Sequence, residues 1–111
     1  MITLSPQVRA LPWDDWLKLA MQAAVDAFHV PASQVTAHGR REPGVSARQV
    51  ACWLCIADLG WSVQTAAWEM GVTRSNALNS VRQVCNHIET EPLFHSRWAR
   101  ARALLKEACS G

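Results

Sequence analysis

The chain has 111 residues, half of them apolar, and a net charge of +2. This length and composition predict one globular domain over residues 1–111 and exclude an intrinsically disordered chain. The charge is too small for a polycation, but its sign is unevenly distributed. Residues 1–38 carry two basic and three acidic side chains, whereas residues 39–111 carry nine and six. No apolar run is long enough to span a bilayer and no signal peptide is visible, so we expect a cytoplasmic protein without membrane contact.

The first predicted element is a helix over residues 12–28, because its apolar residues recur at helical spacing. Asp14 and Asp15 suit its first turn, where they complement the positive end of the helix dipole. Trp13 and Trp16 lie three residues apart in this helix, and two interpretations stay open. The helix buries both rings by docking across the bundle, or it offers a surface to a second copy or to a replication protein.

The chain then breaks at residues 30–31, and we expect a short helical turn over residues 31–35 and a loop over residues 38–44. A central helix follows over residues 46–59, with Ser46 as its N-cap. It holds Cys52 and Cys55 in its most apolar part. Free cysteine in such a setting is a small hydrophobic residue, and a zinc site would need a second ligand pair. We therefore predict that all four cysteines are core thiols, with no metal site and no cofactor.

Residues 62–89 predict a helix-turn-helix, the plan of many DNA readers. Ser62 caps a short helix over residues 63–70, and a turn follows over residues 71–73. Thr73 then caps a longer helix over residues 74–89. Three more tryptophans lie in or before this region, and we expect Trp53 and Trp68 in the core and Trp61 packed at a helix entry.

The longer helix of this motif has two unlike sides. At about 100° per residue, one side is apolar and the other is polar without acidic residues. The apolar set is Leu78, Val81, Val84, Cys85 and Ile88, and the polar set is Ser75, Asn76, Asn79, Gln83 and Asn86. Asn and Gln can pair with adenine in a major groove, which favours DNA contact. The alternative is an ordinary solvated helix face, although such faces usually carry Lys and Glu.

A final amphipathic helix is predicted over residues 92–109. We interpret its basic side chains as a solvated face rather than as phosphate contacts; they are Arg97, Arg100, Arg102 and Lys106. No nucleophile has a base at motif spacing, and the four histidines are scattered. The sequence therefore predicts an all-α protein that is not an enzyme.

Residues 16–105 resemble the C-terminal DNA-binding domain of the bacterial replication initiator DnaA. The similarity follows the order of elements: a helix leading into Ala-Phe-His-Val-Pro, a basic loop, Ala-Arg-Gln opening a long apolar helix, and the Ser-capped helix before the reader helix. The resemblance implies a Trp-repressor-like helical bundle. It further implies that Arg40, in the loop with Arg41, enters a minor groove and that Arg48 meets phosphate.

The reader helix departs from the family's Gly-Gly-Arg-Asp-His-Thr-Thr-Val opening. Thr73 stands where the family has Asp, Arg74 where it has His, and Ser75 and Asn76 where it has two Thr. The resemblance therefore implies the DNA-binding mode and leaves the target sequence open. The residues expected to bind DNA are Arg40, Arg41, Arg48, Thr73, Arg74, Ser75, Asn76, Asn79, Arg82 and Gln83.

The replication initiator also carries a nucleotide-binding motor. We expect no counterpart of it in this chain, because the chain lacks a phosphate-cradling Gly-x-x-x-x-Gly-Lys-Ser/Thr loop. We expect a stand-alone reader of double-stranded DNA that controls replication initiation. Two alternatives stay open, a transcriptional regulator with the same motif and a protein-interaction module that has lost DNA binding.

Overall fold

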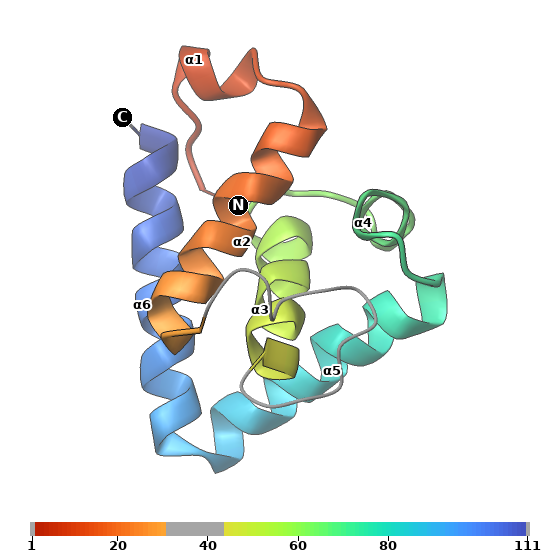
Figure 1. Cartoon of the computed structure of the whole chain (residues 1–111), viewed down its shortest axis with the longest axis vertical. Helices are drawn as coiled ribbons and strands as arrows, with labels where there is room; N and C mark the ends of the chain where they lie inside the picture. The colour runs from red at the N-terminus through yellow and green to blue at the C-terminus, as the bar shows by residue number, and fades with distance from the viewer. Residues whose placement is uncertain (1, 31–43, 111) are drawn as a thin grey trace.

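The computed structural model describes residues 2–30 and 44–110, and within these ranges all regular structure is helical (Figure 1). The all-α prediction is therefore confirmed. The helices are α1 (Pro6–Arg9), α2 (Trp13–Phe28), α3 (Gly44–Ala57), α4 (Val63–Met70), α5 (Arg74–Thr90) and α6 (Pro92–Ser110). In the described part of the chain, no helix is both long and apolar enough to cross a membrane.

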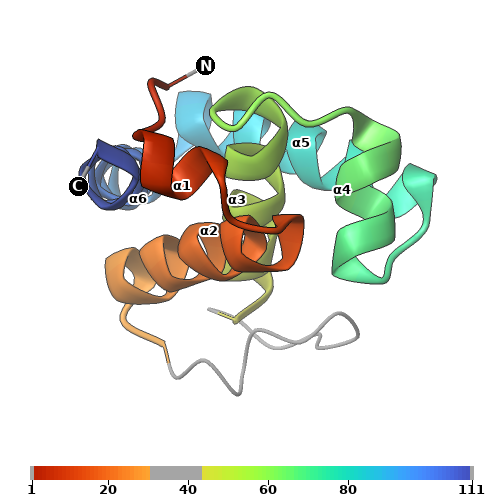
Figure 2. The same cartoon turned by 90° about the horizontal axis from the view of Figure 1, so that it is seen from above.

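Helix α3 is the centre of the bundle (Figures 1 and 2). It packs against α2 on one side and α5 on another, while α6 packs against both α2 and α5. Helix α4 contacts the next helix, α5, and also α3 and α2. Both views place α4 and the first turns of α5 at one edge of the molecule, on the side opposite α6.

Small residues let these helices approach closely. Ala20, Ala24 and Ala27 are buried along one side of α2, and Ala47 and Ala51 are fully buried in α3. A helix with no side chain beyond Cβ at the contact permits short interaxial distances. Larger residues fill the remaining core space and include Phe28, Val50, Leu54, Val84, Phe94 and Leu105.

The two helix starts predicted in the helix-turn-helix region are confirmed. Ser62 accepts the backbone N–H of Thr65 at 3.0 Å, and Thr73 accepts that of Asn76 at 3.0 Å. Each hydroxyl satisfies one N–H that has no partner inside its helix. The same device begins α1, which the sequence analysis did not predict, through Ser5 and the N–H of Val8.

Both ends of the central helix lie two residues earlier in the sequence than predicted. It begins at Gly44, so Ser46 lies inside the first turn and is not the cap. It ends at Ala57, because the N–H groups of both Asp58 and Leu59 point back to the carbonyl of Leu54 and tighten the last turn. The C-terminal limit is set by a backbone reversal before Gly60, which has a φ of 79°.

Three tryptophans gather where the N-terminal region meets the bundle. Trp61 is 6% exposed, lies nearly parallel to Trp16 at 6.4 Å between ring centroids, and contacts Trp13 at 5.7 Å. The indole N–H of Trp16 donates to the carbonyl of Val8 at 2.7 Å. Docking across the bundle, one of the two interpretations of α2, therefore holds for Trp16, whereas Trp13 remains 49% exposed.

Three of the four cysteines are core thiols, as predicted, and the fourth is not. Cys52, Cys55 and Cys109 are buried, and burial raises the pKa of each thiol, that of Cys52 to about 11. Cys85 is exposed, so that part of the prediction was wrong.

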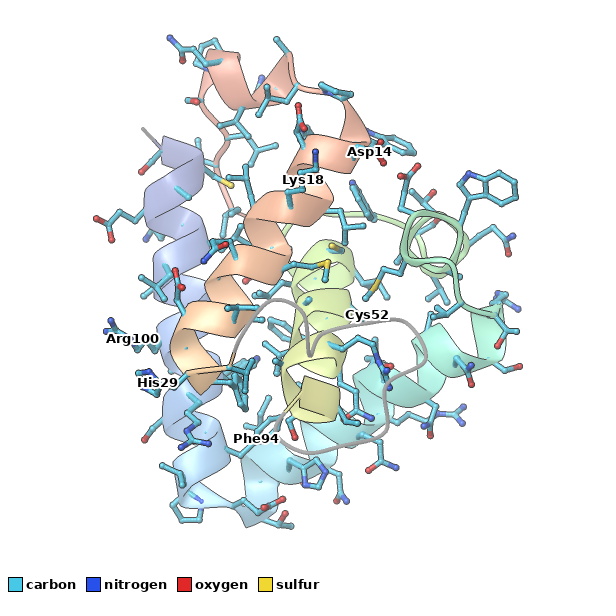
Figure 3. All side chains as sticks on the ribbon, viewed as in Figure 1. Asp14, Lys18, His29, Cys52, Phe94 and Arg100 are labelled. Carbon is cyan, nitrogen blue, oxygen red and sulfur yellow. The ribbon has the colours of Figure 1, made fainter. Side chains whose placement is uncertain are left out.

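The basic side of α6 is not uniformly solvated, which corrects a second expectation. Arg102 donates from Nε and Nη2 to the two carboxylate oxygens of Asp58, both at 3.0 Å. Its guanidinium also lies over the rings of Trp53 and Trp98, at 5.3 and 5.2 Å from their centroids. Arg102 therefore fixes α6 against the end of α3, whereas Arg100 points away from the bundle (Figure 3).

Candidate nucleic-acid interface

A glycine closes the turn between α4 and α5. Gly71 is the C-cap of α4 with a φ of 70° and a ψ of 31°, the left-handed conformation that favours glycine. Its N–H and that of Val72 return to the last carbonyls of α4, with the Val72 nitrogen 3.0 Å from the Ala67 oxygen. Nothing lies within 4 Å of a Cβ placed at Gly71, so the backbone conformation alone requires glycine there.

Helix α5 begins immediately after this turn and presents its first residues to solvent. Thr73, Arg74, Ser75 and Asn76 are all exposed. No acidic residue lies in the first turn, and the cap leaves other N–H groups of that turn without helical partners. The beginning of α5 therefore combines the positive end of a helix dipole with an arginine, a combination that favours anions.

The polar side continues for three further turns. Asn79, Arg82 and Asn86 are exposed and Gln83 is half-buried. Among residues 2–30 and 44–110, no side chain forms a hydrogen bond or ion pair with Asn79, Arg82 or Gln83. We call Arg74, Ser75, Asn76, Asn79, Arg82 and Gln83 the α5 polar face.

The buried side of α5 is rotated from the predicted one. Ala77 and Val84 are its fully buried residues, and the thiol of Cys52 donates to the Ala77 carbonyl across a 3.8 Å contact. Leu78 is only partly buried, and Cys85 faces solvent. The sequence analysis weighted the larger apolar residues and so missed Ala77, where a small side chain lets α5 approach α3 closely.

Acidic groups border the α5 polar face at a distance and are absent from it. Between Thr73 and Ile88 the sequence contains two arginines and no Asp or Glu. The nearest acids along the helix are Glu89, in its last turn, and Glu91, its C-cap, whose carboxylate contacts His87. The charge on this face is therefore positive, which a nucleic-acid phosphate requires.

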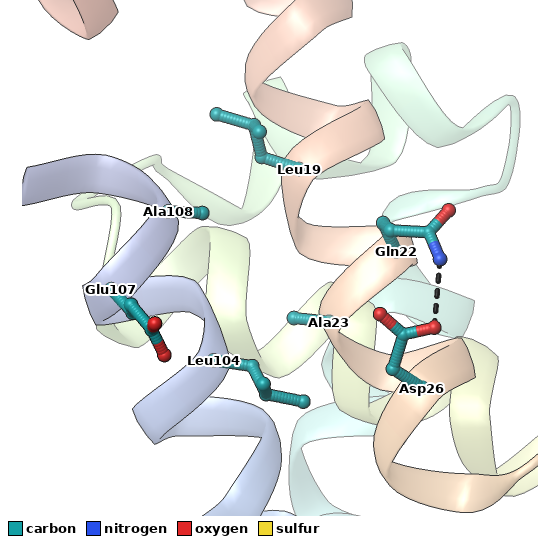
Figure 4. Close-up of a pocket in the computed structure, with 7 residues that line it drawn as sticks. All are labelled: Leu19, Gln22, Ala23, Asp26, Leu104, Glu107 and Ala108. Atoms are coloured by element: carbon teal, nitrogen blue, oxygen red, sulfur yellow. Dashed lines mark hydrogen bonds between the residues drawn. The ribbon is translucent and has the colours of Figure 1, made fainter. Parts of the chain in front are cut away.

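The groove between α2 and α6 is unlike this face (Figure 4). It has a volume of about 330 Å³ and an apolar floor that includes Leu19 and Leu104. Asp26 and Glu107 line it, and the amide of Gln22 donates to Asp26 at 2.8 Å. Two carboxylates repel phosphate, so this groove does not extend the candidate interface.

Three of the predicted DNA contacts lie outside α5 in the sequence. Arg40 and Arg41 lie outside the described residues. Arg48 is half-buried near the beginning of α3 and is engaged in an interaction within the chain. Of the residues predicted on α5 itself, Gln83 is half-buried and the others are exposed.

The prediction that Trp68 lies in the core is wrong, because its side chain is 80% exposed. Val63, Ala66, Ala67 and Met70 form the packed side of α4. At about 100° per residue, Trp68 falls on the opposite side of the helix. Helical spacing could have identified this position, but the size and apolar character of tryptophan outweighed it.

Comparison of the chain with family models, with curated proteins and with solved structures finds no match. In the part of the chain that the structure describes, no three His, Cys, Asp or Glu side chains are grouped as metal ligands would be. The resemblance to the initiator's reader domain therefore stays a prediction from the sequence.

Proposed function

We propose that this chain binds double-stranded DNA with sequence selectivity, inserting the α5 polar face into a major groove. The observation that carries the proposal is a helix face of exposed Asn, Ser and Arg with a half-buried Gln and without an acidic residue. Asn and Gln can form two hydrogen bonds to adenine, and Arg can do so to guanine.

The surrounding geometry supports this use of α5. Helix α4, the Gly71 turn and α5 follow one another as in a helix-turn-helix, and the first turns of α5 lie at an edge of the molecule (Figure 2). The N-terminal part of a recognition helix is the part that reaches base edges. In this chain it carries Arg74, Ser75 and Asn76, all exposed.

The process that we propose is control of replication initiation, and it rests on the sequence resemblance. Transcriptional regulation would use the same surface. The chemistry at α5 is the same in both cases, so DNA binding is the function to be tested first.

The test is selection from a random duplex library followed by binding at several salt concentrations. A sequence-selective reader enriches a motif, and the logarithm of its binding constant for that motif falls linearly with the logarithm of salt concentration as counterions are released. A matched duplex with the motif scrambled should bind more weakly. If no motif is enriched and no duplex shifts at low salt, the α5 polar face is not a DNA reader and the interaction module becomes the better interpretation.

A further inference from the structure

A small pocket lies where the N-terminal segment, the end of α3 and α6 meet. It has a volume of about 260 Å³ and is lined by Ile2, Asp58, Arg102, Ala103 and Lys106. Arg102 and Lys106 contribute two positive charges and Asp58 contributes one negative charge, so the lining as a whole is positive. We call these five residues the Arg102 pocket.

The guanidinium of Arg102 uses only one of its two-donor edges. An arginine has five N–H donors in a rigid fork, and an edge with two of them can hold two oxygen atoms of one anion. Arg102 uses the edge of Nε and Nη2 for the two oxygens of Asp58, each at 3.0 Å. The outer edge, formed by Nη1 and the second N–H of Nη2, has no hydrogen-bond partner within residues 2–30 and 44–110. A second oxyanion matches this outer edge as Asp58 matches the inner one.

The packing around Arg102 leaves its outer edge accessible and fixes its orientation. The Asp58 side chain is only 2% exposed, so the inner edge is closed, whereas the side chain of Arg102 is 44% exposed. The guanidinium also lies over the rings of Trp53 and Trp98, at 5.3 and 5.2 Å from their centroids. Because these contacts already hold the side chain, a ligand at the outer edge does not have to immobilise a flexible arginine.

Lys106 supplies a second positive charge to the pocket. It follows Arg102 by four residues in α6, and residues at this spacing are neighbours on a helix surface. In the described part of the chain its ammonium forms no ion pair. Two like charges at this spacing repel each other, and an anion between them relieves the repulsion. Asp58 lies on the inner side of Arg102, where both of its oxygens are already engaged.

We propose that the Arg102 pocket binds a small oxyanion, the carboxylate or phosphate group of a small-molecule ligand. Two oxygens of the anion accept hydrogen bonds from the outer edge of Arg102, and the ammonium of Lys106 lies beside them. A singly charged anion is favoured over a more highly charged one, because the negative charge of Asp58 is close by. Helix α6 lies on the side of the molecule opposite the first turns of α5, so the proposal stands whether or not α5 binds DNA (Figures 1 and 2).

The test is a titration of the full chain with sodium acetate and, separately, with inorganic phosphate, followed by NMR of the backbone amides. We expect the amide signals of Ala103 and Lys106 to shift saturably, with a dissociation constant of about millimolar size, the scale of one charge-assisted fork and one exposed charge. The anion that binds more tightly identifies the group as carboxylate or phosphate. Sodium chloride, titrated over the same range of ionic strength, should give no saturable shift, because chloride has no pair of oxygens for the fork.

Two variants and a matched control separate the fork from the charge. Lys106→Gln should weaken binding by about threefold and leave the pair of Asp58 and Arg102 in place. Arg100→Gln is the control, since it removes one positive charge from the outer side of the same helix and should change the affinity by less than about 1.5-fold. Arg102→Lys keeps a cation beside Asp58 but has no planar fork, so the saturable shift should disappear. If Arg102→Lys does not fold, the comparison of Lys106→Gln with Arg100→Gln still decides the question.

The proposal is overturned if neither oxyanion shifts these amides saturably, or if chloride does so equally well. It is also overturned if Arg100→Gln weakens binding as much as Lys106→Gln does, because net charge alone then attracts the anion. Duplex binding is measured on the same variants. If Lys106→Gln weakens duplex binding as much as Arg82→Ala does, the phosphate that reaches the pocket belongs to DNA and the small-ligand proposal is wrong. Weaker oxyanion binding with duplex binding intact is the expected result.

Discussion

Asp58 and Arg102, 44 positions apart in the sequence, form a two-point ion pair that joins the end of α3 to α6. The Asp58 side chain is only 2% exposed, whereas that of Arg102 is 44% exposed. The hydrogen bond to Asp58 raises the pKa of Arg102, so the guanidinium keeps its proton. The arginine supplies the buried carboxylate with its two hydrogen bonds and keeps its own outer edge in water.

Removal of Arg102 should therefore be costly. Arg102→Ala leaves a buried carboxylate without its partner and removes a side chain that covers two indole rings. We expect a loss of about 2–4 kcal/mol in the free energy of unfolding, below the full range for breaking a buried pair because Arg102 is partly solvated. Urea denaturation measures it. Arg100→Ala, on the outer side of the same helix, should cost less than about 0.5 kcal/mol; equal costs would mean that the pair adds nothing.

Substitutions of Trp61 can separate two contributions to stability: the packing of its ring and the cost of its unpaired indole N–H. Its ring is buried against Trp13 and Trp16, but within the described residues its indole N–H has no hydrogen-bond partner. Trp61→Ala should cost about 3–5 kcal/mol through the cavity that it leaves. Trp61→Phe should cost about 1–2 kcal/mol, because it keeps one ring and removes the unpaired N–H. Chemical denaturation compares the two, and similar losses would show that ring packing is not the main contribution.

If the α5 polar face reads bases, substitutions on it should affect specific and non-specific DNA binding differently. Asn79→Ala should weaken binding to the selected site by about 1–3 kcal/mol while random duplex binding stays nearly unchanged, since a base contact is lost. Arg82→Ala should weaken both, as expected of a phosphate contact. Competition binding against scrambled duplex measures the two affinities. Equal effects of Asn79→Ala on both duplexes would remove α5 from the role of reader.

Thiol reactivity should separate Cys85 from the other cysteines. In the native protein an aromatic disulfide reagent should modify Cys85 within the first rapid phase, because it is the exposed thiol. Cys52, Cys55 and Cys109 should react only on unfolding, since burial raises the pKa of each and shields it from the reagent. Cys85→Ser should abolish the rapid phase. A rapid phase that persists in this variant would place a second thiol at the surface.

The raised pKa of Glu69 predicts how its contribution to the stability of the folded protein changes with pH. Its pKa is raised in the folded protein, so the folded state binds a proton more readily there than the unfolded state does. The stability contributed by this proton is present at pH below the unfolded value and is lost as pH rises through the folded value. Glu69→Gln should therefore raise the melting temperature at neutral pH relative to wild type, and the difference should shrink in acid. A difference that grows in acid would contradict the shift.

Local signals in the sequence were sufficient for the helix starts at Ser62 and Thr73, because a cap depends on residues within one turn. The amphipathic pattern likewise predicted which side of α5 carries Asn79 and Asn86, both of which are exposed. It placed the buried side less well, since Ala77 packs against α3 through its small size rather than its hydrophobicity.

Tertiary pairings escaped the sequence analysis for a different reason. Nothing near Arg102 in the sequence indicates a carboxylate partner, because Asp58 reaches it only when α3 and α6 are already packed. The exposure of Trp68 was missed although helical spacing contained the signal. Its neighbour Glu69 gave no indication either, because its contact with Asp14 depends on how α2 meets α4.

The N-terminal segment also brings distant parts of the chain together. The N–H of Ser5 donates to the carbonyl of Cys109 at 2.8 Å, and that of Ile2 donates to the carbonyl of Asp58 at 2.9 Å. Ser5 thus lies beside Cys109 in the last turns of α6 and Ile2 lies against Asp58, so segments near the two ends of the described chain are neighbours. A short linker could join them into a continuous loop of chain, so that circular permutants with new ends between other helices would keep the same helix packing.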